Sequence, residues 1–341
     1  MEPDVLPWSD NLMSTVRITD VDPTRGDELL AWNSLLGEGF NAGREAAWWA
    51  SDETTSARYG DPKPDRTSVL LLATREGLPV GAAGADMDPG EAAEVEISVL
   101  PAHRRQGVGT ALAEAVRDRL RGAAEIMQAE TYSEAGVAFA TTLGLRAGHR
   151  EHRLLLDVPV DLEALRAQHA RPAGAPSAPK IQVRSWTGAC PEGVIEEWAR
   201  LTTQMEEDVP LGDLTRPAAR SDVAGVRRSE QRMADQGWIL VRSLARLDGA
   251  AVGYTEMFVN RHDPEIITQD DTLVDPGHRG HGVGRALKLA NLENLRGVDE
   301  AREARWVQTY TAPDNTAMLT LNRAFGFRDA DQLTILEGTV G

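Results

Sequence analysis

Cysteine and lysine are the two chemically reactive residue types that this sequence uses least. Cys190 is the only cysteine, so no disulfide can form within the chain, and a reducing cytoplasm is the expected location. Cys190 lies in a turn-like stretch without a neighbouring histidine, which favours an incidental thiol over a nucleophile. Lysine occurs only at positions 63, 180 and 288, and the other basic residues are arginine. We connect no function with that bias.

Long apolar segments are also missing. A run such as Val69 to Ala73 has the length of a buried strand, and it is far too short to span a bilayer. The residues that follow Met1 include neither the basic region nor the apolar region of a secretory signal. We therefore expect a soluble protein with no membrane partner.

Positive charge is scarce relative to negative charge. The 36 basic and 53 acidic residues leave a formal net charge of −17. A nucleic acid or an anionic membrane needs a basic surface, so the composition argues against both partners. It permits a cationic small molecule, although acidity also serves solubility.

An internal repeat determines the domain organisation. Residues 99–112 align with residues 274–287 at an offset of 175, and nine of the fourteen positions are identical. A β-hairpin pattern precedes each copy and a helical pattern follows it. With 341 residues the chain has enough length for two domains. Prolines 172, 176 and 179 mark a linker, so we expect domains at 14–168 and 181–341 joined by a Pro/Ala linker at 169–180.

The repeated loop has the features of an anion site. In the first copy Val95, Ile97 and Val99 alternate with polar residues and predict a strand that ends at the loop. The helix expected after the second copy runs from about Val283 to Leu295. A loop that enters a helix N-terminus presents unpaired backbone N–H groups and the positive end of the helix dipole. Glycines at 107, 109, 282 and 284 let a phosphate approach the backbone closely.

Two common phosphate loops do not match. Neither copy has the Gly-Lys-Ser/Thr ending of the P-loop of nucleoside triphosphatases. Leu112 and Leu287 stand where the dinucleotide-binding fingerprint has its third glycine. The remaining pattern, Arg-x-x-Gly-x-Gly, resembles the coenzyme A loop of the GNAT superfamily of N-acyltransferases. The resemblance covers roughly residues 14–160 and 180–341, and two GNAT domains in one chain are similar to the tandem architecture of mycothiol synthases.

This resemblance implies a fold and a co-substrate. The expected fold is α/β (α+β), with two tandem domains that each have a mixed, mostly antiparallel sheet flanked by helices. The expected co-substrate is acetyl-CoA, and no metal is expected, because His103 and His278 have no partners at metal-ligand spacing. The residues expected to bind acetyl-CoA are Val99, Arg104, Arg105, Gln106, Gly107, Val108, Gly109 and Thr110 in the first copy, and Val274, Arg279, Gly280, His281, Gly282, Val283, Gly284, Arg285 and Asn315 in the second.

The second domain is the expected catalytic one. GNAT enzymes often have an asparagine at the start of the last helix, where it helps to hold coenzyme A. Asn315 occupies that place, whereas the first copy has Ser133. The tyrosine that often serves as acid four residues before the final glycine is replaced by Ala140 and Asn322. Tyr132 and Tyr310 are then the available phenols, with a core packing role as the alternative for each.

The general base is less well indicated. The usual glutamate falls at Ala93 and Thr268, but acids lie nearby, and Glu96 aligns with Asp271. A β-bulge would be enough to bring one of these acids into reach. We therefore name Asp271, Glu256 and Tyr310 as the catalytic candidates, with a solvated strand edge as the alternative for Asp271.

The expected reaction is transfer of an acetyl group to a primary amine of a small molecule by direct attack. The first helix of each domain should line the acceptor pocket, at Leu29 to Trp49 and Glu196 to Leu214, where Glu206, Glu207 and Asp208 could hold a cation or form a solvated helix end. The alternatives are a non-catalytic acetyl-CoA sensor and a longer acyl donor. Both a monomer and a homodimer are compatible with the sequence.

Overall fold

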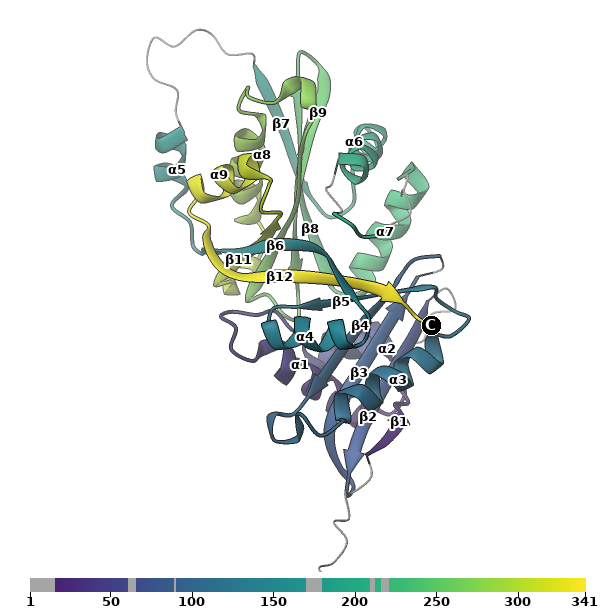
Figure 1. Cartoon of the computed structure of the whole chain (residues 1–341). Helices are drawn as coiled ribbons and strands as arrows, with labels where there is room; N and C mark the ends of the chain where they lie inside the picture. Colours follow the sequence, from purple (N-terminus) through teal and green to yellow (C-terminus); the bar gives the residue numbers. More distant parts are fainter. Residues whose placement is uncertain (1–15, 61–65, 89, 170–179, 209–211, 216–220) are drawn as a thin grey trace, which may run out of the picture.

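The strands of this protein form one continuous twelve-stranded sheet (Figure 1). The computed structural model describes residues 16–60, 66–88, 90–169, 180–208, 212–215 and 221–341. We call the described residues up to 168 the first half and those from 181 onward the second half. Most of the predicted linker, residues 170–179, lies outside the described residues. Within the described ranges, no helix combines the length and the apolar composition needed to cross a membrane.

Each half contributes six strands, and each contains a β-hairpin where the sequence predicts one. The first half has β1 (Arg17–Asp20), β2 (Thr67–Arg75), β3 (Leu78–Met87), β4 (Ala93–Val99), β5 (Ile126–Thr131) and β6 (Arg146–Asp157). The second half has β7 (Ile181–Thr187), β8 (Trp238–Leu247), β9 (Ala250–Asn260), β10 (Ile266–Val274), β11 (Trp306–Thr311) and β12 (Arg328–Thr339). Among these strands the neighbours β4–β5 and β10–β11 run parallel and the other neighbours antiparallel, which confirms the mixed, mostly antiparallel fold.

The two halves exchange their last strands. The strand order is β1-β2-β3-β4-β5-β12-β6-β11-β10-β9-β8-β7, so β12 pairs with β5 of the first half and β6 pairs with β11 of the second. Figure 1 shows β12 running beside β5 and β6 at the junction of the halves. Leu336 and Val340 therefore belong to the core of the first half, and Leu154 and Leu156 to that of the second. No feature of the sequence pattern indicates this exchange.

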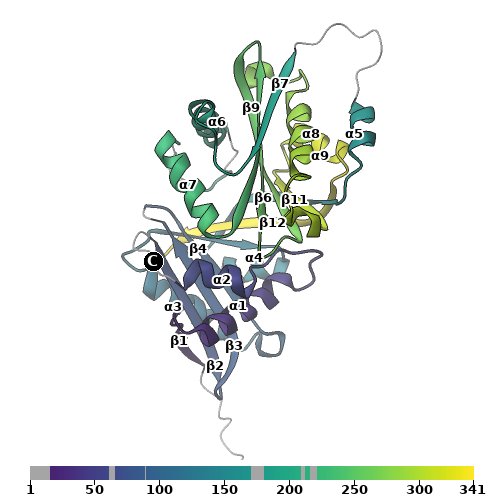
Figure 2. The same cartoon turned by 180° about the vertical axis from the view of Figure 1, so that it is seen from behind.

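Helices cover both faces of the sheet in each half (Figure 2). In the first half Gly84 lies against Trp32 and Gly81 against Leu112, which places α1 and α3 on opposite faces. In the second half α8 covers the face of Gly253, and α6 covers the opposite face, where Trp198 contacts Tyr254. The helices are α1 (Gly26–Asn41), α2 (Asp52–Tyr59), α3 (Val108–Leu120), α4 (Glu134–Thr142), α5 (Leu162–His169), α6 (Ile195–Asp208), α7 (Val223–Asp235), α8 (Val283–Leu295) and α9 (Thr316–Ala324).

The helices after the repeated loops agree with the sequence prediction, and the first helices do not. The predicted bounds of α8 are the observed ones. The predicted helix Leu29 to Trp49 is wrong, since α1 ends at Asn41 and a second helix, α2, begins at Asp52. The predicted helix Glu196 to Leu214 is also too long, because α6 ends at Asp208 and the described residues 212–215 are not helical. Helix α7 was not predicted.

Helix α1 ends early at a local stop signal. Gly43, the residue after the C-cap Ala42, has a φ of 75°, the left-handed conformation that ends many helices. The guanidinium of Arg153 on β6, also in the first half, donates hydrogen bonds to the backbone carbonyls of Glu45 and Ala46. Thr54 donates to Asp263 of the second half at a distance of 2.7 Å.

Candidate active site

Both repeated loops have the same backbone geometry at the start of a helix. Gly107 and Gly282 are the N-cap residues of α3 and α8, with φ values of 82° and 87°, and no side chain caps either helix. The first N–H groups of each helix therefore have no acceptor within the helix. A Cβ atom added at either glycine would meet no atom within 4 Å, so the space above these N–H groups is open. This combination suits the pyrophosphate of an acyl donor.

The loop arginines have a structural task in both copies. Arg104 donates from Nε to the carbonyl of Val99 at 2.8 Å, and Arg279 donates from Nε to the carbonyl of Val274 at 3.0 Å. Each arginine thereby ties the loop to the end of the preceding strand. The Nη2 atom of Arg279 also lies 3.2 Å from Asp208 at the end of α6. Part of the positive charge assigned from the sequence to a phosphate is thus already paired.

The second glycine of each loop is required for packing as well. A Cβ atom at Gly109 would lie 3.1 Å from the ring of Phe139 on α4, and one at Gly284 would lie 3.3 Å from Leu321 on α9. The sequence analysis considered only access for a phosphate at these positions. The structure brings the predicted loop residues together in two separate junctions: 99 and 104–110 between β4 and α3, and 274 and 279–285 between β10 and α8.

Asn315 caps the last helix of the second half. Its Oδ1 accepts a hydrogen bond from the backbone N–H of Met318 at 3.1 Å. Ser133 does the same for Gly136 in the first half, at 3.0 Å. Capping alone accounts for a polar residue at this position, while the exposed amide of Asn315 keeps N–H groups that could reach a ligand.

The parallel strands of each half separate before they end. Residues 266–268 of β10 pair with residues 306–308 of β11, and residues 93–95 of β4 pair with residues 127–129 of β5. Beyond these pairs the two strands of each parallel pair present backbone that is not paired across the gap. The opening between β10 and β11 leads toward the loop at Val274, so a donor bound there can extend between the strands.

A β-bulge interrupts β10 at this opening. Gln269 pairs with Met257 and Thr272 with Thr255, so β10 has one residue more than β9 between those pairs. The extra residue lies at Asp270 and Asp271, where the sequence allowed for a bulge. The buried amide of Gln269 stabilises it by donating to the carbonyl of Glu256 at 2.8 Å. In the first half β4 pairs with β3 in an unbroken register.

The bulge assembles three carboxylates. Glu256, Asp270 and Asp271 each have an oxygen within 4.8 Å of the others, a grouping that could attract a metal ion or an ammonium group. Glu256 is buried, whereas the side chain of Asp270 is exposed to solvent. Partial desolvation first, and then the negative charges of Asp271 and Glu256, raise the pKa of Asp270 above its ordinary range.

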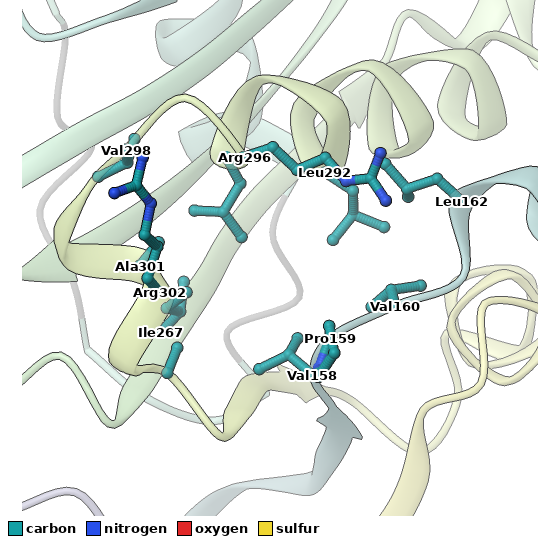
Figure 3. A pocket seen from close by; sticks show the side chains of 12 residues that line it. Val158, Pro159, Val160, Leu162, Ile267, Leu292, Arg296, Val298, Ala301 and Arg302 are labelled. Carbon is teal, nitrogen blue, oxygen red and sulfur yellow. The ribbon is translucent and has the colours of Figure 1, made fainter.

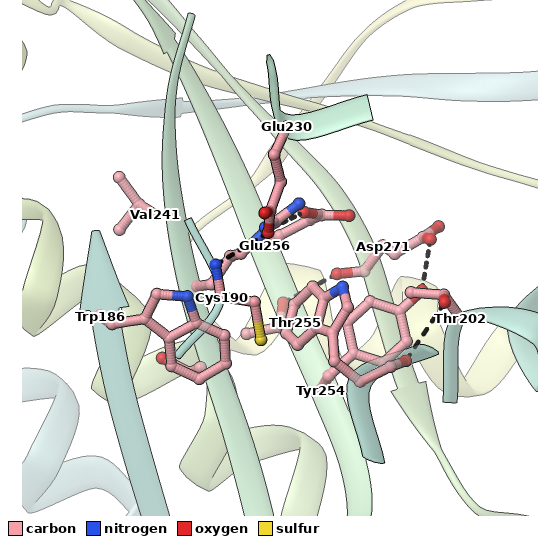
Figure 4. Close-up of polar contacts among 12 residues, drawn as sticks. Trp186, Cys190, Thr202, Glu230, Val241, Tyr254, Thr255, Glu256 and Asp271 are labelled. Atoms are coloured by element: carbon pink, nitrogen blue, oxygen red, sulfur yellow. Dashed lines mark hydrogen bonds and ion pairs between the residues drawn. The ribbon is translucent and has the colours of Figure 1, made fainter. Parts of the chain in front are cut away.

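Two of the carboxylates already have protein partners (Figure 4). Tyr254 donates to Oδ2 of Asp271 at 2.6 Å, and Arg242 donates from Nε to Glu256 at 2.9 Å. Arg242 also contacts Glu230 of α7 at 2.5 Å, and both side chains are buried. Glu256 therefore belongs to a buried Arg242–Glu230 network, so among the predicted acids Asp271 is better suited than Glu256 to accept a proton.

Sequence reasoning missed Tyr254, Arg242 and Glu230. The hairpin register would have found two of them. Arg242 lies directly opposite Glu256, and opposite charges facing each other across a strand pair indicate contact. Tyr254 lies two residues before Glu256 and therefore on the same face of the sheet. Glu230 belongs to the unpredicted helix α7, and no sequence signal connects it to the site.

Tyr310 lies on the other side of the opening. It is the fifth residue of β11 and is opposite Arg153 of β6. Its hydroxyl oxygen is 3.0 Å from that of Tyr132, so the two phenols that the sequence singled out meet across the halves. Burial raises the pKa of Tyr310, against the lowering effects of the hydrogen bond from Tyr132 and of the nearby arginines. A neutral phenol with such a pKa can serve as a proton donor.

The first half has no equivalent of the acidic site. The close approaches of Gly81 and Gly253 to the neighbouring strand align the two hairpins. In that alignment the facing pair Arg242–Glu256 corresponds to Leu70–Gly84. The ring of Trp32 lies over Gly84, and its Nε1 donates to the carbonyl of Ala83 at 2.7 Å. A tryptophan thus fills the space that carboxylates occupy in the second half.

The remaining acids of the first half are arranged differently. Glu94 and Glu96 project from the same face of β4, and burial raises the pKa of Glu96 to about 7, the charges of Asp86 and Glu94 adding to the effect of burial. Arg58 lies close enough to counteract this rise. Glu96 is therefore the counterpart of Asp271 in its position along the strand, but β4 has no bulge at that position.

A separate apolar cavity lies at the far end of α8 from the loop (Figure 3). It has a volume of about 340 Å³. Leu292 and Leu295 of α8, Ile267 of β10 and the segment from Val158 to Val160 line it, and Arg296 and Arg302 lie at its edge. Because it borders the start of β10 rather than the bulge, the cavity is not part of the acidic site.

Comparisons with known proteins identify the family of this chain. The family model described as Acetyltransferase (GNAT) family matches residues 31–144 and 198–327, one match in each half. The chain is 29% identical over 279 residues to the mycothiol acetyltransferase of Salinispora arenicola, and the aligned residues cover 81% of this chain and 83% of that protein. It is 27% identical over 335 residues to the mycothiol acetyltransferase of Thermobifida fusca, over 92% of this chain and 95% of that protein.

The fold has a similar solved structure. A tandem GNAT protein from the clavulanic acid biosynthesis pathway superposes with a TM-score of 0.74 at 24% identity. The superposition covers 96% of this chain and 99% of that one, so the similarity includes both halves. The two family matches lie on the two strand–loop–helix junctions and their surroundings. The chain therefore belongs to the GNAT acetyltransferase family and is an N-acetyltransferase of the tandem type.

Proposed function

We propose that the second half transfers an acetyl group from acetyl-CoA to the primary amine of a small molecule. One observation carries this proposal: β10 and β11 stop pairing after Thr268 and Gln308, and just beyond that point β10 has its bulge at Asp270 and Asp271 while β11 continues to Tyr310. A base, an acid and an anion site thereby flank one gap. The backbone N–H groups at Gly282 to Arg285 would hold the donor pyrophosphate.

The acids prepare the acceptor. An ammonium group must lose a proton before it can attack the thioester, and a carboxylate with a raised pKa takes that proton most readily near neutral pH. Asp271, oriented by Tyr254, is the proposed base, and Asp270 lies beside it in the same group of carboxylates. The three carboxylates also favour a cationic acceptor over a neutral one.

Tyr310 is the proposed acid. When the amine nitrogen has bonded to the acetyl carbon and the carbon–sulfur bond breaks, the thiolate needs a proton, and the hydroxyl of Tyr310 supplies it. Solvent then restores the proton to Tyr310, and Asp271 releases the one taken from the amine. Alignment of the two substrates in the gap contributes a further part of the rate.

The first half is proposed as a scaffold that keeps its coenzyme A loop. Trp32 and Gly84 replace the acidic site there, while the loop geometry at Gly107 is retained. The relatives named mycothiol acetyltransferases support a small-molecule acceptor, and we do not assign their acceptor to this chain.

Calorimetry with acetyl-CoA tests the proposal. We compare the wild type with Gly109→Trp and Gly284→Trp, whose new side chains must push against Phe139 and Leu321 and thereby disturb one loop at a time. If the wild type binds one acetyl-CoA and only Gly284→Trp loses it, the result supports transfer by the second half. If the wild type binds two and each variant loses one, both loops bind acetyl-CoA. A panel of amino sugars, polyamines and amino acids, read by release of free thiol, then identifies the acceptor.

The alternatives give different results. Binding without thiol release from any amine favours a non-catalytic sensor, and tighter binding of a longer acyl-CoA favours another donor. With an accepted amine, Asp271→Asn should lower kcat by about 10² to 10⁴ without changing the affinity for acetyl-CoA. Full activity of Asp271→Asn would contradict the proposed base.

A further inference from the structure

The two tyrosines that occupy equivalent places in the repeat are in direct contact. Tyr132 follows β5 in the first half and Tyr310 lies near the end of β11 in the second. Their hydroxyl oxygens are 3.0 Å apart, and either can donate. Because β6 and β12 separate β5 from β11 in the sheet order, two side chains must reach across two strands to form this contact.

We propose that Tyr132 is a positioning residue for the reaction of the second half, holding Tyr310 and stabilising the phenolate that Tyr310 becomes when it protonates the leaving thiolate. The inference rests on the proposed role of Tyr310 as the acid. It gives the first half a chemical task that does not depend on a second active site.

Proton transfer from Tyr310 fixes the direction of the hydrogen bond between the two hydroxyl groups. While both phenols are neutral, either oxygen accepts. Once the O–H bond of Tyr310 has broken and its proton has moved to the thiolate sulfur, the Tyr310 oxygen can only accept, so Tyr132 must donate. A hydrogen bond to a charged oxygen is stronger than one between neutral groups. Tyr132 therefore stabilises the product of the proton transfer more than the starting state, which assists the transfer.

The surroundings of Tyr132 hold its ring in place. The guanidinium carbon of Arg44 lies 3.3 Å from the centre of the Tyr132 ring. The Arg44 side chain is only 6% exposed and pairs with Asp331 of β12 at 3.0 Å, so its position over the ring is held from both sides. A buried cation over a phenol ring is attracted to the face of that ring, which fixes the orientation of the ring. Phe40 contacts the Tyr132 ring in an edge-to-face arrangement.

Arg153 completes the arrangement around Tyr310. It is fully buried, lies opposite Tyr310 in the strand pair, and donates to Gln308 at 3.0 Å. Its charge, like that of Arg44, lowers the pKa of Tyr310 against the effect of burial. Arg44 belongs to the first half and Arg153 to a strand of the first half that lies in the sheet of the second. The acid of one half is thus placed and tuned by residues of the other.

A double-mutant cycle on kcat tests the inference. The variants are Tyr132→Phe, Tyr310→Phe and the double variant, with thiol release from acetyl-CoA measured both with the best amine of the panel and with water as acceptor. Tyr132→Phe keeps the ring under Arg44 and removes only the hydroxyl. We expect it to lower kcat about 10-fold with an unchanged affinity for acetyl-CoA.

The decisive comparison is in the background of Tyr310→Phe. If Tyr132 acts through Tyr310, then adding Tyr132→Phe there changes kcat by no more than about twofold. A merely structural role would lower kcat by the same factor in both backgrounds and would overturn the inference. Tyr59→Phe is the matched control: it removes another phenol hydroxyl of the first half, one that donates to Asp86 at 2.5 Å, and it should leave kcat unchanged.

The outcomes separate this inference from the proposed function. If Tyr310→Phe lowers kcat and Tyr132→Phe does not, Tyr310 remains the acid and the role of Tyr132 is refuted. If Tyr310→Phe leaves kcat intact, both the proposed acid and the inference fail. Thermal unfolding of each variant shows whether a loss of kcat reflects a loss of folded protein.

Discussion

Arg105 and Gly280 occupy the same position of the two repeated loops, and both have a positive φ, 60° and 80° respectively. Only glycine adopts this backbone conformation without strain. The second loop therefore has its required geometry at little cost, whereas the first has it with an arginine in a strained conformation. The duplicated loops have kept one shape with different residues.

This difference predicts opposite effects of two substitutions on stability. Arg105→Gly should raise the free energy of unfolding by about 0.5 kcal/mol, because the strain relieved exceeds the entropy added to the unfolded chain. Gly280→Ala should lower it by about 1 kcal/mol. Denaturant unfolding of both variants measures the effects. If both substitutions change the free energy of unfolding in the same direction, backbone strain does not determine stability at this position.

The raised pKa of Asp270 predicts the pH dependence of activity. The group of carboxylates must be deprotonated to accept the proton of the amine, so kcat/KM should rise with pH as Asp270 loses its proton, and this acid limb should lie above the value near 4 of an ordinary aspartate. Asp270→Asn removes one of the two negative charges and should move the limb of Asp271 to lower pH. The measurement is a pH profile of kcat/KM for both proteins.

Glu96 provides the control for that profile, because burial raises its pKa to about 7 in the first half. Glu96→Gln should leave the acid limb where it is. If Glu96→Gln abolishes a limb near pH 7 and Asp270→Asn does not, the first half is the active one.

Lys288 predicts a pH-dependent stability. It is buried in α8, with its Nζ atom 5.7 Å from the centre of the Phe327 ring, and burial lowers its pKa to about 7. In the unfolded chain its pKa is about 10.4. Between these values the unfolded chain binds the extra proton, so this residue makes the free energy of unfolding increase with pH, by up to about 1.4 kcal/mol per pH unit.

Lys288→Met should therefore be more stable than the wild type at pH 7, with an advantage that shrinks as the pH approaches 10. The free energies of unfolding of the two proteins across this range give the difference directly. Lys180→Met replaces an exposed lysine and should show no such trend. A difference between Lys288→Met and the wild type that is constant with pH would contradict a buried, neutral Lys288.

The exchange of the last strands predicts where a distant mutation acts. Leu336 is fully buried in the core of the first half although it belongs to the last strand of the chain. Leu336→Ala should cost about 2–5 kcal/mol and should loosen β4 and β5. Hydrogen exchange localises the effect, and Leu319→Ala, in the core of the second half, is the matched control. Loss of protection confined to the second half in Leu336→Ala would argue against the exchange.

The sequence by itself determined the local elements of this protein. The hairpins, the two loops and the bounds of α8 follow from periodicity, glycine positions and helix-start signals, which act over a few residues. The sequence also allowed for a bulge in β10, since a bulge would bring one of the acids near Thr268 into reach. The family resemblance of the loops rested on the same short patterns.

Only the tertiary structure decided which distant residues meet. The order of β12 and β6 in the sheet, the contact of Tyr132 with Tyr310, and the network of Arg242 with Glu230 and Glu256 join residues that are far apart in the chain. Such pairings depend on the closure of long loops and on shared burial, and neither leaves a periodic signal in the sequence.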